Sequence, residues 1–303
     1  MISVSVIISV YSRDRLKDIK KCIRFLSEQT LLAKEILVVV DPDQDLINFY
    51  HENLRNDVKI VRSNGFGLSN ARNSGIKASS GEIVAFIDDD AFPDNFWLEN
   101  LVKPYCDSTV VSVGGFIKPN WPYSKPYWFP EELFWIIGCS YKGLPEKKSI
   151  VRNPIGCNMS FRKKIFEDVG YFRTDIGRFG KNLLGSEEPE LCTRISTKYP
   201  ELKIIYNPDA IVYHNVIPKR LKISYLWKRS FFEGFSKALL MSDAPKINDS
   251  FSTEDTFLNY LLTKAIPFRV KKFYHGIYAV QLLVLAFSTS SVFLGFLAGK
   301  LMR

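Results

Sequence analysis

Three consecutive aspartates, Asp88, Asp89 and Asp90, directly follow the apolar run 82–87. Carboxylates crowded at the end of a buried strand repel one another, and a bound cation relieves that repulsion most readily. Oxygen ligands favour a hard divalent ion, which can also bridge to phosphate oxygens. We therefore predict a site for a divalent cation here. The alternative is an acidic cluster at the start of a helix, which would account for one or two of the aspartates.

The elements that position these aspartates follow an alternating pattern. From residue 3 to about residue 116, short β-branched runs alternate with amphipathic stretches, which indicates βαβ units and a mostly parallel α/β sheet. Ligands bind beyond the carboxyl ends of strands in such sheets, where Ser12, Arg13 and Asp41 also stand. The predicted strands are 3–10, 34–40, 58–62, 82–87 and 110–114, and the predicted helices are 17–27, 46–56, 68–79 and 95–105.

Beyond residue 116 the pattern changes. Residues 117–155 interleave aromatic residues, among them Trp135, with prolines, and we predict an irregular segment over the sheet that supplies aromatic walls. The alternative is a hydrophobic staple without a ligand. A shorter second half follows, with predicted helices at 187–198 and 223–238, extended segments at 204–206 and 211–213, and a polar linker at 243–254.

The amino-acid composition limits the classes of binding partner that we expect. The formal charge of +9 favours an anionic partner such as a nucleotide diphosphate or a membrane surface. No nucleic-acid-binding motif is present, so we predict no nucleic-acid partner. Five dispersed cysteines without C-x-x-C spacing indicate neither a disulfide framework nor a zinc site, and favour a reducing, cytosolic setting. The apolar N-terminal run predicts a buried first strand rather than a signal peptide.

The C-terminal segment 276–298 carries no charged residue. As a helix rising about 1.5 Å per residue it is long enough to cross a hydrocarbon core of about 30 Å. The polar patch 288–291 would tolerate a break, so an interfacial hairpin and a buried helix pair stay open as alternatives. Lys264, Arg269, Lys271 and Lys272 precede it and predict that the main domain lies on the cytoplasmic side of a membrane. We predict a catalytic domain at 1–240, a linker with a basic juxtamembrane helix at 241–275, and a membrane anchor at 276–303.

Four strings stand in the chain at characteristic spacings: 5–13 (SVIISVYSR), 35–41 (EILVVVD), 70–76 (NARNSGI) and 86–90 (FIDDD). Together they resemble the family 2 glycosyltransferases of GT-A fold. The resemblance covers roughly residues 3–240 and implies a nucleotide-diphosphate-sugar donor and Mg²⁺ or Mn²⁺. We predict no protein partner.

The resemblance assigns the donor-side residues. Asp88 and Asp90 match the D-x-D pattern, with Asp90 as a direct metal ligand and Asp89 beside the donor. Arg72 matches a basic residue near the diphosphate, and its alternative is a surface helix charge. His214 resembles a histidine that touches the metal or the diphosphate, and its alternative is a structural role. The nucleotide would lie against Val10, Tyr11, Ser12, Arg13 and Asp41.

The string 185–194 (GSEEPELCTR) resembles the family's acidic pair, whose second member acts as catalytic base. The family usually has Glu-Asp there, whereas this chain has Glu187 and Glu188. Glu188 is therefore the implied base, with Glu187 in reserve, and the alternative is that both only stabilise the start of a helix. Arg194, Asn158 and Trp135 are the implied acceptor-side residues.

Two further strings, 135–145 (WIIGCSYKGLP) and 152–162 (RNPIGCNMSFR), resemble a narrower group, the archaeal glucosyl-dolichyl phosphate glucuronosyltransferases. This implies a UDP-hexuronate donor and a lipid-linked sugar as acceptor. More broadly we predict an acceptor that is lipid-linked or a cell-envelope glycan, and direct attack assisted by one carboxylate base, which inverts the anomeric carbon. One rival is a catalytically inactive scaffold that binds nucleotide sugars. A nucleotidyltransferase is another, but no glycine-rich phosphate loop follows the first strand.

Overall fold

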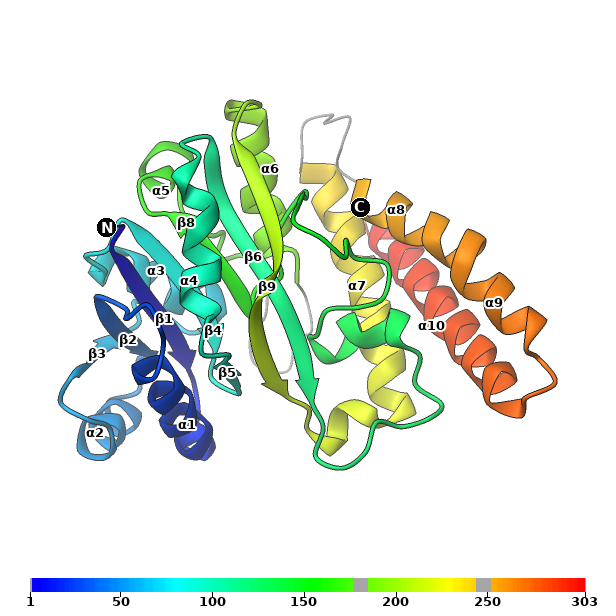
Figure 1. Cartoon of the computed structure of the whole chain (residues 1–303), viewed down its shortest axis with the longest axis horizontal. Coiled ribbons are helices and arrows are strands. Elements are labelled where there is room, and N and C mark those ends of the chain that lie inside the picture. The colour runs from blue at the N-terminus through cyan, green and yellow to red at the C-terminus, as the bar shows by residue number, and fades with distance from the viewer. Residues whose placement is uncertain (1, 177–184, 244–251, 303) are drawn as a thin grey trace. The chain divides into compact units, whose positions relative to one another are not determined.

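The computed structural model describes residues 2–176, 185–243 and 252–302 (Figure 1). By internal contacts the chain divides into two compact units. The first unit comprises Met1–Lys118, Glu146–Asn182 and Glu187–His214, and the second comprises Pro119–Pro145, Leu183–Ser186 and Asn215–Arg303. These limits differ from the predicted domain boundaries after residues 240 and 275, which stay a prediction.

A nine-stranded mixed sheet forms the centre of the first unit, with the strand order β3-β2-β1-β4-β8-β6-β9-β5 and β7 paired to β9. Strands β1 to β4 are parallel, and β8 runs antiparallel to β4. The predicted α/β fold is confirmed. The strands are β1 Val4–Val10, β2 Glu35–Val40, β3 Val58–Arg62, β4 Ile83–Asp88, β5 Ala91–Pro93, β6 Val110–Asn120, β7 Ser149–Ile150, β8 Asn158–Arg162 and β9 Lys203–Asn215.

Helices connect the parallel strands (Figure 1). Helix α1, for example, buries Ile19, Cys22, Ile23 and Leu26, which recur at helical spacing on one face. The helices of the first unit are η1 Arg13–Arg15, α1 Leu16–Ser27, α2 Gln44–Asn53, α3 Leu68–Ala78, α4 Trp97–Val102, η2 Lys103–Cys106, α5 Ile165–Val169 and α6 Glu187–Lys198. The predicted helices agree within a few residues, except that 95–105 is two shorter helices.

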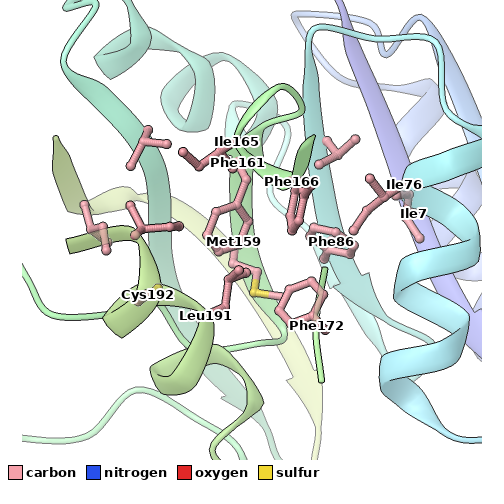
Figure 2. Packing of buried hydrophobic residues seen from close by; sticks show 14 of the residues in the cluster. Ile7, Ile76, Phe86, Met159, Phe161, Ile165, Phe166, Phe172, Leu191 and Cys192 are labelled. Carbon is pink, nitrogen blue, oxygen red and sulfur yellow. The ribbon is translucent and has the colours of Figure 1, made fainter. Parts of the chain in front are cut away.

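A cluster of aromatic and aliphatic side chains fixes α6 and the segment around Phe172 to the sheet (Figure 2). The ring of Phe172 meets the ring of Phe86 edge-on, with centroids 5.9 Å apart. Leu191, Cys192 and Ile195 bring the inner face of α6 into the same cluster. Burial of this apolar surface therefore holds in place the helix that begins with Glu187 and Glu188.

The second unit is largely helical. Its elements are η3 Glu131–Ile137, η4 Pro218–Leu221, α7 Ile223–Asp243, α8 Ser252–Tyr260, the π-helical turn η5 Leu261–Ala265, α9 Ile266–Lys271 and α10 Gly276–Leu301. The predicted irregular segment 117–155 therefore contains a 3₁₀ helix, the end of β6 and the short strand β7. Of the predicted polar linker, residues 244–251 lie outside the described part of the chain, and 252–254 begin α8.

Helices α7 and α10 lie side by side in the second unit and touch through their backbones (Figure 1). A Cβ added to Gly234 on α7 would lie 1.9 Å from the Val292 carbonyl oxygen, and one added to Gly295 would lie 1.9 Å from that of Phe231. The Ser291 hydroxyl also donates to the Trp227 carbonyl at 2.9 Å. Small residues that permit such close approach are typical of helix pairs in membranes.

Helix α10 runs unbroken through the polar patch 288–291, so the hairpin alternative is wrong. Within the described ranges it is the one helix long and apolar enough to cross a membrane, with a mean hydropathy of 2.0. It pairs with α7, but its outer face leaves Leu283, Phe293 and Leu301 exposed. Arg269 was predicted to be one of four juxtamembrane cations, and this role is corrected. It is buried and forms two hydrogen bonds with Glu132, at 2.7 and 3.0 Å.

Candidate active site

The three aspartates lie where β4 passes into β5. Asp88 is the last residue of β4, and Asp89 and Asp90 are buried in the turn that follows. Burial, and next the Asp90 charge, raise the pKa of Asp89 well above its usual range. Helix α4 begins only at Trp97, so the helix-capping alternative for the aspartates is wrong. The predicted crowding of carboxylates at the sheet edge is present.

Arg15 compensates part of this negative charge. Its Nη1 lies 3.3 Å from Asp90 Oδ2, and its Nε lies 3.6 Å from Asp89 Oδ2. Burial alone would lower the pKa of Arg15, but Asp89 and Asp90 raise it above its usual value. The guanidinium therefore stays charged beside the aspartates. Arg13 was predicted as a site residue, whereas Arg15, two residues beyond the end of the string 5–13, was not.

Two more side chains reach the same edge. His214 Nε2 lies 3.2 Å from Asp90 Oδ1, since β9 pairs with β5 in the register His214 to Ala91. The ligand atoms of Asp88, Cys157 and His214 all lie within 4.8 Å of one another. Carboxylate, thiol and imidazole groups in this grouping fit a divalent cation. Cys157 was not among the predicted site residues.

Arg72 and Glu188 form a buried ion pair, in which Arg72 Nη1 lies 2.8 Å from Glu188 Oε1 and 3.6 Å from Glu187 Oε1. Arg72 is only 3% exposed, so the surface-charge alternative is wrong. Burial by itself would lower its pKa, but Glu188, Glu187 and Asp88 together raise it. Both glutamates also lie in the first turn of α6, where the helix dipole favours negative charge.

Gly156 lies directly against this ion pair. A Cβ added to Gly156 would lie 2.0 Å from Glu188 Oε1 and 2.5 Å from Arg72 Nη2. The Glu188 carboxylate thus lies directly against the backbone at Gly156. The next residue is Cys157, so one turn supports both the ion pair and the metal-compatible cluster.

The predicted nucleotide-side residues gather at the ends of β1 and β2. Val10 is buried at the end of β1, whereas the Tyr11 ring is 62% exposed. The Ser12 hydroxyl caps η1 by accepting a hydrogen bond from the Asp14 backbone N–H at 3.3 Å. Arg13 donates to the Asp45 carbonyl oxygen at 3.3 Å. These contacts order the segment but leave its nucleotide contacts a prediction.

Asp41 directly follows β2 and is partly buried. Desolvation raises its pKa, and a hydrogen bond from the Gly67 backbone N–H opposes that shift. Gly67 has a φ of +96°, a conformation that favours glycine, at the position just before α3. The start of the helix that carries Arg72 is therefore tied to the end of β2.

Asn158 does not have the predicted acceptor-side position. It is fully buried in β8, where its Oδ1 accepts a hydrogen bond from Trp97 Nε1 at 2.8 Å. Its Nδ2 donates to the carbonyl oxygens of Ala210 and Phe116, at 2.8 and 3.1 Å. Because these partners use the amide within the sheet, we correct its role to a structural one.

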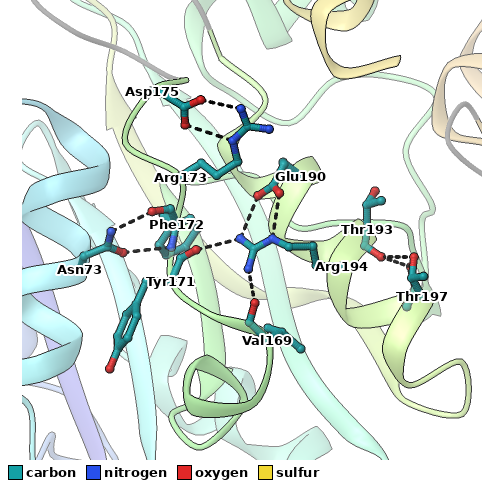
Figure 3. A network of polar contacts seen from close by, with 11 residues as sticks. Asn73, Val169, Tyr171, Phe172, Arg173, Asp175, Glu190, Thr193, Arg194 and Thr197 are labelled. Carbon is teal, nitrogen blue, oxygen red and sulfur yellow. Dashed lines mark hydrogen bonds and ion pairs between the residues drawn. The ribbon is translucent and has the colours of Figure 1, made fainter. Parts of the chain in front are cut away.

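Arg194 is likewise structural (Figure 3). Its guanidinium pairs with both carboxylate oxygens of Glu190 at 2.8 Å, and donates to the carbonyl oxygens of Tyr171 and Val169. It therefore clamps the chain after α5 to α6 and does not have the predicted acceptor contact. Trp135 lies on η3 in the second unit, with Arg229 Cζ 6.0 Å from its ring centroid, and its acceptor role stays a prediction.

Comparison with known proteins assigns the family. Residues 5–170, more than half of the chain, match the family described as Glycosyl transferase family 2. The chain belongs to this family. This glycosyltransferase is 31% identical over 305 residues to the glucosyl-dolichyl phosphate glucuronosyltransferase of Haloferax volcanii, covering 98% of the chain and 96% of that relative.

Solved structures agree on the GT-A fold of this family 2 glycosyltransferase. A mannosyltransferase from Pyrobaculum calidifontis, in complex with GDP-Man and Mn²⁺, superposes with a TM-score of 0.62 at 18% identity, over 99% of this chain and 87% of the other. GalNAc-T7 with UDP, GalNAc and Mn²⁺ gives a TM-score of 0.55 at 16% identity, over 91% and 58%. At these identities the likeness shows the fold alone.

Proposed function

We propose that this glycosyltransferase moves a hexuronic acid from a UDP-sugar to a lipid-linked acceptor, with inversion at the anomeric carbon. The observation that carries the proposal is that two groups of charged side chains occur together in the first unit. One is the aspartate cluster with Asp88 and Asp90, and the other is the buried ion pair of Arg72 and Glu188. The name of the Haloferax volcanii relative, which matches over almost its full length, supports the donor and acceptor classes.

Asp88 and His214 would hold a divalent cation, with Asp90 beside them. A bound Mg²⁺ or Mn²⁺ supplies positive charge against the diphosphate of the donor. Tyr11, Ser12 and Asp41 bind the nucleotide at the ends of β1 and β2. Arg15 opposes the rise in the pKa of Asp89 and orients the neighbouring aspartates, because its guanidinium lies within 3.6 Å of both carboxylates.

Glu188 acts as the general base. It accepts the proton of the acceptor hydroxyl while that oxygen attacks the anomeric carbon from the side opposite the leaving group. Arg72, which was predicted to lie at the diphosphate, instead holds the Glu188 carboxylate in one orientation at 2.8 Å. Direct attack of this kind inverts the configuration and needs no covalent nucleophile.

A nucleotide-sugar panel tests the donor. In the presence of Mn²⁺, UDP-hexuronates should raise the melting temperature of the protein most, because a ligand at 100 times its Kd stabilises the folded state by about 2.7 kcal/mol. Asp90→Ala should abolish the shift, and Asp209→Ala, an exposed change on the same strand β9, should not. A wild-type protein that no sugar nucleotide stabilises would contradict the proposal.

We also propose that α10 anchors the enzyme in a membrane, with the first unit on the cytoplasmic side. Deleting α10 would uncover α7, so substitutions on the exposed outer face give a cleaner test. Leu283→Lys with Phe293→Lys should move the protein from the membrane pellet to the supernatant, since each lysine costs about 3 kcal/mol at a membrane-helix centre. The control is Leu32→Lys, an equally exposed leucine of the first unit. A doubly substituted protein that still sediments would refute the anchor.

A further inference from the structure

We infer that the sulfur of Cys157, as the thiolate, is a ligand of the cation at this edge of the sheet, and that it makes the site select transition-metal divalent ions over Mg²⁺. The thiol proton is released to solvent when the cation binds. The inference rests on the proposed function in one respect, because both place a cation at Asp88 and His214. It goes further by naming a sulfur ligand and the metal preference that sulfur imposes.

Strand register places the sulfur at the site. Strand β8 pairs antiparallel with β4, with Asn158 opposite Ile87. The residues next to this pair are Cys157 and Asp88, so they face each other where the two strands end. His214 arrives from β9 through its pairing with β5. Three elements far apart in the sequence thus bring one oxygen, one sulfur and one nitrogen ligand within 4.8 Å of one another.

Cys157 differs from the other cysteines in its surroundings. Cys22 and Cys192 are buried on the inner faces of α1 and α6, and Cys192 belongs to the apolar core cluster. Cys106 is exposed. Within residues 2–176, 185–243 and 252–302, Cys157 is the cysteine that shares a metal-compatible cluster with a carboxylate and an imidazole. It is also buried, at 4% exposure, so its position is fixed by the fold.

The mixed set of oxygen, sulfur and nitrogen ligands determines which metal ion the site prefers. Mg²⁺ requires oxygen ligands in near-octahedral geometry and keeps much of its water. Thiolate and imidazole instead favour later first-row ions, whose affinity for N, O and S sites rises from Mn²⁺ through Co²⁺. A sulfur among the ligands therefore weakens Mg²⁺ binding relative to Co²⁺ or Zn²⁺. A serine at the same position would remove this discrimination while keeping a polar side chain.

Cobalt provides a direct readout of the sulfur. The full-length protein is titrated with Co²⁺ in the presence of UDP, and the near-ultraviolet sulfur-to-cobalt charge-transfer band is recorded. We expect the band in the wild type and in Cys106→Ser, which removes the exposed thiol that would bind cobalt adventitiously. Cys157→Ser and Cys157→Ala should lack the band, and the preference for Co²⁺ over Mg²⁺, measured by competition, should fall by about 10- to 100-fold.

A second measurement does not depend on any variant folding. X-ray absorption of the zinc-loaded wild type should show a sulfur neighbour at about 2.3 Å. If calorimetry finds cobalt or zinc bound but neither spectrum shows sulfur, the Cys157 inference is overturned and the proposed function stands. If the wild type binds neither metal in the presence of UDP, both fail. Retention of the band by the Cys157 variants would also overturn the inference.

Discussion

Glu188→Gln is expected to lower kcat by about 100- to 10,000-fold, the range that a positioned general base contributes. The amide has nearly the same size as the carboxylate and its oxygen can still accept a hydrogen bond from Arg72, but it cannot take up the proton of the acceptor hydroxyl. The Kd for the UDP-sugar should stay unchanged, because the substitution leaves the aspartate cluster and the β1 and β2 ends intact. Steady-state kinetics and calorimetry measure the two quantities separately.

Glu201→Gln is the matched control, since Glu201 is exposed and the change in charge is the same. It should leave both quantities at the wild-type values. Full turnover by Glu188→Gln would exclude Glu188 as the base. If the wild type itself binds the donor but transfers no sugar to any lipid-linked acceptor, the inactive-scaffold alternative is favoured instead.

Gly156→Ala is expected to lower kcat by about 100-fold, the scale of effect when a catalytic group is displaced by about 1 Å. The new methyl group would lie 2.0 Å from Glu188 Oε1 and 2.5 Å from Arg72 Nη2, so the ion pair must move. Gly156 is not among the described glycines with positive φ, so the backbone itself accepts alanine. The effect should therefore fall on activity through crowding alone.

The control for this change is Gly276→Ala. A Cβ added at Gly276 meets no atom within 4 Å, so kcat and the melting temperature should both be retained. Melting curves show whether Gly156→Ala is folded before kinetics are compared. A folded Gly156→Ala enzyme with unchanged kcat would mean that Glu188 does not have to occupy its present position during transfer.

Local sequence patterns were enough to predict the α/β sheet and its acidic edge. Apolar runs of five to seven residues correspond to β1 to β4, and the aspartates that end β4 follow from the rule that ligands bind at carboxyl ends of strands. Strand β9 was predicted as two segments, because Asn207, Pro208 and Asp209 are typical turn residues. The backbone instead stays extended through them, and Asn207 donates to the Asn100 carbonyl oxygen at 2.8 Å.

Arg15 and Cys157 were not predicted because their partners are remote in sequence. Arg15 contacts Asp89 and Asp90, more than seventy residues away, and Cys157 meets Asp88 only through the pairing of β8 with β4. That pairing is where the parallel strands β1 to β4 give way to antiparallel pairs, and no periodicity in the sequence reveals it. Asn158 and Arg194 show the opposite error, since a family resemblance does not reveal that the hydrogen bonds of a side chain are used within the fold.

The glycine contacts between α7 and α10 limit how the second unit can respond to a lipid bilayer. With backbone atoms touching at Gly234 and Gly295, neither helix can roll about its own axis without a steric clash. In the proposed membrane-anchored state the two helices would therefore tilt together. A bilayer that is too thin or too thick for α10 would then also change the inclination of α7, so lipid thickness would act as a mechanical variable for this part of the enzyme.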